Sequence, residues 1–222
     1  MQAVEARARG GKSGRIDWPD DRTCASDTVE VAADDRRTVA DDVTRIVMPA
    51  GGGVAGQPVC SYLVGRRRFV LVDPGDPTGL ALDRAIALAE ERGGSIGAIA
   101  LTHADPDHHG GAEALAWRLG IPVLGGPGAG RSVPFEVAEV ADMTHLADTD
   151  VPFHAVLTPG PRPDHVAYIV GDGAAVISGD LDGVRGARSI VGPIDAASFA
   201  ASRARLDGLH PAAPRLPGHP PV

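Results

Sequence analysis

The stretch from Leu101 to Gly111 constrains the fold of this chain most strongly, because polar side chains crowd the junction between two regular elements. The apolar residues 96–101 predict a strand, and residues 112–119 have the spacing of an amphipathic helix. Five histidine and aspartate side chains fall within the seven residues 103–109. A loop at the end of a buried strand can bring imidazole and carboxylate groups together at one point. The stretch therefore predicts a metal site.

The pattern of apolar residues over the rest of the chain predicts an α/β fold. Runs of β-forming residues between glycine- and proline-containing turns predict strands at 43–47, 60–64, 69–72, 96–101, around 123, and at 154–157, 166–170 and 174–178. Helical spacing predicts helices at 80–91, 112–119 and 197–209. The repeated order of strand, helix and strand in the middle of the chain is typical of a sheet covered by helices.

The length and composition predict one domain with a tail. The chain has 222 residues, of which 43% are hydrophobic, and this is enough for one substantial core. Residues 1–40 are rich in Arg, Asp, Gly and Ala with little apolar periodicity, so we expect a flexible N-terminal tail. Residues 41–222 are expected to form the folded domain.

The charge and the cysteine content narrow the partners and the location. The 29 acidic residues outnumber the 21 Lys and Arg, so the net charge of −8 does not favour nucleic-acid binding. Only Cys24 and Cys60 are present, which fits a reducing compartment. No apolar run approaches the length of a membrane span. We expect a cytoplasmic protein without a membrane segment, acting on a small-molecule substrate, and its oligomeric state remains open.

The cluster at residues 103–108 resembles the His-x-His-x-Asp-His signature of the metallo-β-lactamase superfamily. Further landmarks of this family follow in the expected order. Asp73-Pro74-Gly75 matches the acidic turn that supports the site, Ser178-Gly179-Asp180 matches a Gly-Asp with a metal-bridging carboxylate, and Leu216-Pro217-Gly218-His219 matches the terminal Pro-Gly-His. The resemblance extends from Val43 to His219.

The resemblance implies a metallo-β-lactamase αββα sandwich, in which two mixed β-sheets are flanked by helices. It also implies a divalent metal centre of one or two ions of zinc, manganese or iron. The metal ligands that it implies are His103, Asp105, Asp107, His108, Asp180 and His219. Asp107 would in addition be the catalytic residue that orients the attacking hydroxide.

Two positions depart from the family pattern. Asp105 stands in place of the second histidine, and Pro161 stands in place of a ligand histidine in a Thr-Pro-Gly-His motif. A carboxylate at position 105 can still bind a cation and would favour manganese or iron(II) over zinc. Pro161 has no donor atom, and His165, four residues later, is a candidate substitute. The second of the two family metal positions keeps its full set, Asp107, His108, Asp180 and His219.

The resemblance implies a hydrolase of a small ester, thioester, lactone or phosphoester. Residues 43–47 and 61–65 look most like the glyoxalase II-like and β-lactamase-like endoribonuclease branches. The main alternative is a degenerate, non-catalytic member with a binding or structural role, for which Pro161 is the chief support. A third reading is iron-dependent oxygen chemistry, as in persulfide dioxygenases, but it depends on the altered first metal position.

Overall fold

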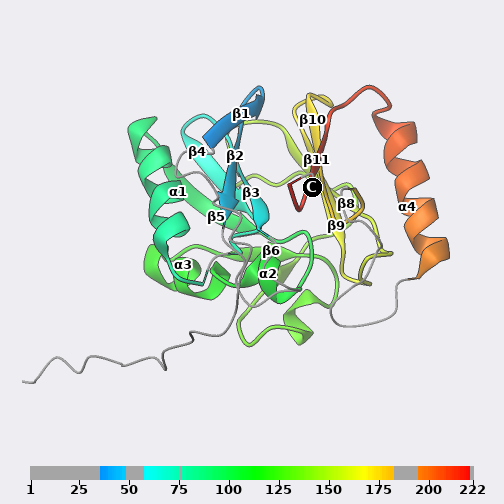
Figure 1. Ribbon diagram of the computed structural model, residues 1–222, viewed down its shortest axis with the longest axis horizontal. Helices are drawn as coiled ribbons and strands as arrows, with labels where there is room; N and C mark the ends of the chain where they lie inside the picture. The colour runs from blue at the N-terminus through cyan, green and yellow to red at the C-terminus, as the bar shows by residue number, and fades with distance from the viewer. Residues whose placement is uncertain (1–35, 49–57, 76, 183–194, 221–222) are drawn as a thin grey trace, which may run out of the picture. The chain divides into compact units, whose positions relative to one another are not determined.

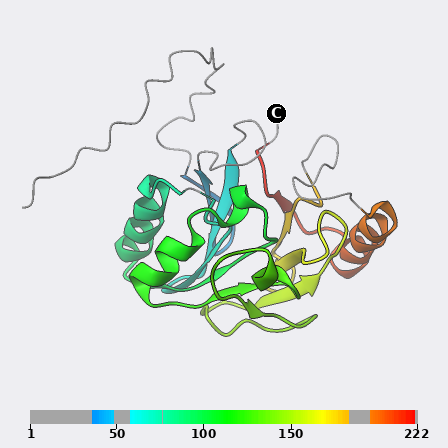
Figure 2. The ribbon, with the colours of Figure 1, turned by 90° about the horizontal axis from the view of Figure 1, so that it is seen from below.

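The computed structural model describes residues 36–48, 58–75, 77–182 and 195–220. Within them the chain forms two β-sheets with helices on both outer sides (Figure 1). Figure 2, turned by 90°, shows the layers in the order helices, larger sheet, smaller sheet and helix. This arrangement confirms the predicted αββα sandwich of two mixed sheets flanked by helices.

The larger sheet has seven strands in sequential order. They are β1 (Arg36–Ala40), β2 (Val43–Met48), β3 (Val59–Val64), β4 (Arg68–Val72), β5 (Ser95–Ala100), β6 (Val123–Gly125) and β7 (Ala138–Glu139). Strands β1 to β4 pair antiparallel, and β4 to β7 pair parallel. Parallel neighbours need crossover connections. Helix α1 (Leu80–Glu91) lies between β4 and β5 in the sequence, and helix α3 (Ala112–Leu119) lies between β5 and β6.

The smaller sheet has four strands in the order β11-β10-β9-β8. They are β8 (Phe153–Leu157), β9 (Val166–Val170), β10 (Ala175–Gly179) and β11 (Arg215–Pro217). The pairs β8–β9 and β9–β10 are antiparallel, while β10 and β11 are parallel. Helix α4 (Ala196–Leu209) lies between β10 and β11 in sequence, and the side chain of Asp195 caps its first turn.

Alternating side chains of the strands bind the layers together. In β4, Val70 and Val72 belong to the core cluster between the two sheets, whereas Phe69 and Leu71 belong to the cluster beneath α1 and α3. A strand buried on both faces is typical of a parallel sheet covered by helices. Each of these side chains contributes about 1.5–3 kcal/mol on burial.

The structure confirms the predicted helices and longer strands but adds elements that the sequence analysis did not predict. These are β1, β7, β11 and the short helix α2 (Pro106–His109). Residues 36–40, which were expected in the flexible tail, form β1 at the edge of the larger sheet, paired to β2 through the backbone. The rest of that predicted tail lies outside the described residues. Among the helices described, none has the length and apolar character to cross a membrane.

Candidate metal centre

The predicted ligand residues lie just beyond the carboxyl ends of strands from both sheets. Thr102 and His103 follow β5, and α2 carries Asp107 and His108. From the smaller sheet, Asp180 directly follows β10 and His219 comes two residues after β11. Because β10 and β11 are parallel, their two loops leave the sheet at the same edge. The two sheets thus bring ligands from distant parts of the sequence together.

The four predicted ligands of the second position lie near one another in the structure. The Asp180 Oδ1 atom lies 3.4 Å from His108 Nε2 and 3.5 Å from His219 Nε2. The His219 Nε2 atom lies 3.7 Å from Asp107 Oδ2. A tetrahedral ion with ligand distances of about 2.0–2.2 Å separates its ligand atoms by roughly 3.3–3.6 Å. The three distances are close to this range, and Asp107, His108 and His219 each offer a ligand atom within 4.8 Å of the others, so this group could hold a cation.

Several atoms of the predicted ligands are buried without a hydrogen-bond partner among the described residues. They are His103 Nε2, His108 Nε2, Asp107 Oδ1 and Asp180 Oδ1. A polar atom that is buried without a partner costs free energy, and native proteins keep few of them. Since nitrogen and carboxylate oxygen are ligands for zinc, manganese and iron, a divalent cation would satisfy these atoms together.

Asp73 orients the His108 imidazole. Its Oδ2 atom lies 2.9 Å from His108 Nδ1, and the backbone N–H and the hydroxyl of Thr102 each donate to the carboxylate at 2.7 Å. A carboxylate next to Nδ1 fixes the proton there and leaves Nε2 free for the ion. Burial lowers the pKa of His108, but the carboxylates of Asp180 and Asp73 raise it well above its ordinary value.

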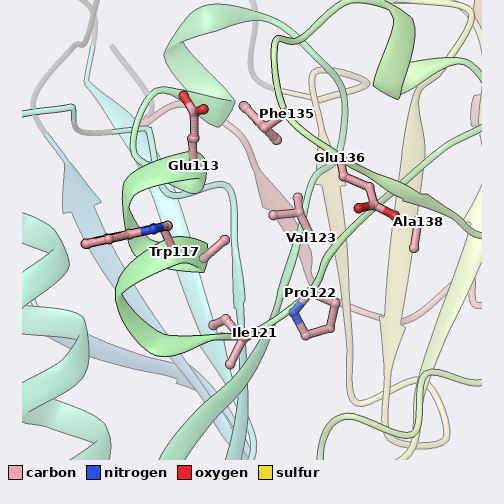
Figure 3. Close-up of a pocket in the computed structure, with 9 residues that line it drawn as sticks. Glu113, Trp117, Ile121, Pro122, Val123, Phe135, Glu136 and Ala138 are labelled. Atoms are coloured by element: carbon pink, nitrogen blue, oxygen red, sulfur yellow. The ribbon is translucent and has the colours of Figure 1, made fainter.

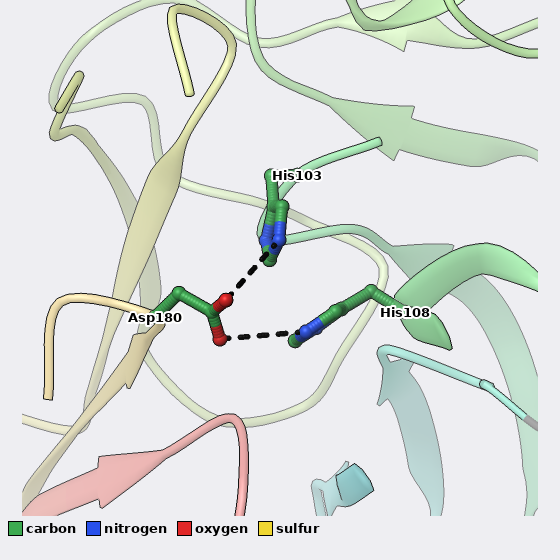
Figure 4. A group of neighbouring side chains, drawn as sticks. All are labelled: His103, His108 and Asp180. Atoms are coloured by element: carbon green, nitrogen blue, oxygen red, sulfur yellow. Dashed lines mark ion pairs between the residues drawn. The ribbon is translucent and has the colours of Figure 1, made fainter. Parts of the chain in front are cut away.

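His103 lies beside His108 and faces the same carboxylate, as Figure 4 shows. The His103 Nε2 atom is 3.6 Å from Asp180 Oδ2, and the two imidazole rings are 4.0 Å apart. Burial raises the pKa of Asp180, whereas His108 and His103 lower it, and the net effect is a pKa far below the ordinary value. Asp180 is therefore ionised, which is the form in which a carboxylate can bind a cation.

Asp105 is brought to the site, but its partner there is an arginine. Its Oδ1 atom accepts a hydrogen bond from Arg162 Nη1 at 2.8 Å, and its Oδ2 atom lies 3.5 Å from His103 Nε2. Burial raises the pKa of Asp105, while His103 and Arg162 lower it below its ordinary value. The sequence analysis did not single out Arg162. The sequence feature that could have drawn attention to Arg162 is its position immediately after Pro161.

His165, the candidate substitute for the ligand missing at Pro161, has both ring nitrogens next to other groups in the structure. Its Nε2 atom accepts the backbone N–H of Asp180 at 3.2 Å, and Nδ1 lies 2.9 Å from the Thr158 hydroxyl. Burial lowers the pKa of His165 to about 3, so the imidazole is neutral. An imidazole with both nitrogens engaged positions Asp180 and is not free to bind metal.

Two other features near this region lie outside the ligand groups. The ring of His109 contacts Phe135, with 5.7 Å between their centroids. A hollow of about 500 Å³ beside α3 is lined by Trp117, Phe135 and other residues, and none of the six predicted ligands is among them (Figure 3). The metal centre and this hollow are therefore separate features of the chain.

The fold and the site define a class of protein, an α/β sandwich with metal ligands converging at one edge of its two sheets. The chain belongs to the metallo-beta-lactamase superfamily, whose family model matches residues 53–219. That match covers the whole ligand set. The chain is thus a hydrolase-like member of a superfamily of metal-binding proteins.

Two relatives and one solved structure illustrate this membership. A hydroxyacylglutathione hydrolase from Anaeromyxobacter dehalogenans (strain 2CP-C) is 33% identical over 201 residues, covering 82% of this chain and 67% of the relative. Another, from Acidiphilium cryptum (strain JF-5), is 32% identical over 148 residues, covering 67% of this chain and 58% of that relative's length. The solved structure of TTHA1623 in a di-iron-bound form is 30% identical with a TM-score of 0.64, covering 79% of this chain and 92% of that one.

Proposed function

We propose that this protein is a metal-dependent hydrolase of a small thioester or ester. The observation that carries the proposal is that four predicted ligand side chains lie close together, with three of their ligand-atom pairs at 3.4–3.7 Å, and that three of the four each keep a buried atom without a hydrogen-bond partner in the described part of the chain. The four are Asp107, His108, Asp180 and His219. The names of the two hydroxyacylglutathione hydrolases support a thioester.

The residues of the site have distinct parts in such a reaction. An ion bound there would supply Lewis acidity, which lowers the pKa of water and polarises the carbonyl under attack. Asp107 Oδ1 has no hydrogen-bond partner among the described residues, so it is available to orient the attacking water and accept its proton. Asp73 holds the His108 ring, and His165 holds the backbone of Asp180.

The charge of the chain supports a small-molecule substrate. With a net charge of −8, the protein would repel the phosphates of a nucleic acid at long range. We therefore place small thioesters and esters first and lactones and phosphoesters second. The two cysteines support a cytoplasmic location.

A non-catalytic binding protein is the second candidate, and one observation favours it. The guanidinium of Arg162 engages Asp105, so a family ligand position is paired with a side chain instead of an ion. A member with an altered first position can retain the fold without turnover, because fold does not establish activity.

The test compares neighbouring histidines in protein loaded with zinc, manganese or iron(II). We expect hydrolysis of a thioester or ester in a panel that also contains lactones and a phosphodiester. His108→Ala and His219→Ala should each lower this activity by roughly 100-fold or more, together with metal content. His109→Ala is the matched control and should keep both. Metal-loaded protein without hydrolysis of any substrate would favour the binding protein.

A further inference from the structure

Arg162 is a buried cation that pairs with Asp105, a residue at a predicted ligand position of the first metal ion. Its side chain is 8% exposed and makes three polar contacts. Nε donates to Asp164 Oδ1 at 2.8 Å, Nη1 to Asp105 Oδ1 at 2.8 Å, and Nη2 to the Ser132 hydroxyl at 3.0 Å. A charge that is removed from water in this way requires partners of opposite sign, and the two carboxylates provide them.

The arginine is anchored to the loop that carries the metal-binding signature. Asp164 accepts the backbone N–H of Ala104 through its second oxygen, at 2.8 Å. Ala104 lies between His103 and Asp105, so the ion pair and the loop form one hydrogen-bonded unit. The planar guanidinium suits this purpose because its donors lie in a fixed fork. Asp105 is thereby neutralised by a side chain of the same domain.

The shared ligand His108 also limits the number of ions as long as Asp105 is paired with Arg162. Two groups of side chains in the described residues could hold a cation: His103, His108 and Asp180 in one, and Asp107, His108 and His219 in the other. The Nδ1 atom of His108 faces Asp73, so only the single lone pair of Nε2 remains for metal. One ion takes it. The other group would then retain only His103 and Asp180, fewer protein ligands than a stable site usually has.

We propose that this chain holds one divalent ion rather than two, and that the Arg162 guanidinium supplies the positive charge of the missing first ion. The inference rests on the proposed function, because it uses the same ligand set. It concerns the number of ions and not the reaction, so it can be tested without a substrate.

The experiment counts ions in chelator-treated full-length protein that is titrated with Co²⁺ or Zn²⁺. Native mass spectrometry and elemental analysis give the stoichiometry, and the visible spectrum of Co²⁺ reports the ligand environment. The wild type should bind one ion tightly. Arg162→Met leaves Asp105 without its counter-charge, so a second ion should bind at least roughly tenfold more tightly than it does to the wild type. Arg162→Lys, which keeps the charge, should remain at one.

Control variants make the outcome decisive. Arg205→Met removes a surface guanidinium that pairs with Asp142, and it should leave the count at one. If Arg162→Met does not fold, Asp105→Asn tests the same assignment, because it should change the affinity for the single ion by less than about threefold. Two ions of similar affinity in the wild type would overturn the proposal. So would an unchanged count in folded Arg162→Met, or a tenfold loss of affinity in Asp105→Asn. A count of one without any hydrolysis would contradict only the proposed function.

Discussion

At the scale of single residues, the candidate centre depends on side chains that are not among its predicted ligands. Asp73 and Thr102 fix His108, and His165 fixes Asp180 through a hydrogen bond from its backbone. The family pattern singled out the candidate ligands in the sequence, since they occur in ordered motifs. It did not identify Arg162, because the partner Asp105 is 57 residues away and only the fold brings the two together.

The substitution His165→Asn tests the positioning role of this histidine. Loss of the acceptor for the Asp180 N–H should lower the free energy of unfolding by about 1–3 kcal/mol at pH 7, as measured by urea denaturation. The ion count should not change, because His165 is not a ligand. A loss of the ion in folded His165→Asn would show instead that this imidazole binds metal.

The same variant should change the response to acid of the metal-free protein. The pKa of His165 is about 3 in the folded state, below its ordinary value of 6.5, because burial disfavours the charged imidazole. The contribution of the neutral His165 to the free energy of unfolding is fully present above pH 6.5. It is lost as the pH falls towards 3, because the unfolded chain then binds a proton at this histidine that the folded chain does not. Urea denaturation between pH 7 and 4 should therefore show a steeper loss of stability in the wild type than in His165→Asn. Equal slopes would contradict this assignment.

At the scale of elements, the sequence predicted the helices and strands that are determined by the local pattern of their own residues. Helix α1 has helical periodicity and strand β9 is a continuous run of β-forming, mostly apolar residues, and both were found where expected. Strands β1 and β11 were not predicted, because an edge strand and a three-residue proline-containing strand are specified by pairing with a neighbour. Strand β11 matters most, because it delivers His219 to the site.

The glycine that precedes His219 should be required by close packing. A Cβ atom on Gly218 would lie 2.8 Å from Asp180 Oδ1 and 2.8 Å from His108 Cε1, so Gly218→Ala should displace ligands and lower metal affinity by roughly tenfold or more. A Cβ atom on Gly208 in α4 would have no other heavy atom within 4 Å. Gly208→Ala should keep metal affinity and raise stability by about 0.5–1 kcal/mol. Equal metal affinity in the two variants, measured by competition with a chelator dye, would refute this account.

At the scale of the whole molecule, the ligands unite the two sheets. His108 lies in the connection between β5 and β6 of the larger sheet, and His219 follows β11 of the smaller sheet. The centroids of their rings are 5.2 Å apart. A bound ion should therefore stabilise the entire domain. At a free concentration 100 times the dissociation constant, it adds about 2.7 kcal/mol to the free energy of unfolding.

Thermal unfolding with and without metal measures this contribution. For a domain of this size, the added free energy should raise Tm by roughly 5–10 °C, and a chelator should reverse the change. His219→Ala is the control, and its Tm should respond much less. A wild-type Tm that is independent of metal would show that the four side chains do not form a stable binding site.

The parallel pairing of β11 with β10 also has a consequence for the order of folding. The predicted ligands of the second position extend from Asp107 to His219, so a bound ion would close a loop that includes all four strands of the smaller sheet and α4. Closing a long loop costs chain entropy before any ligand contact offsets it. Metal capture should thus be a late step, after the final strand has docked. In the finished protein the ion would act as a crosslink between the sheets, and its release would report their separation.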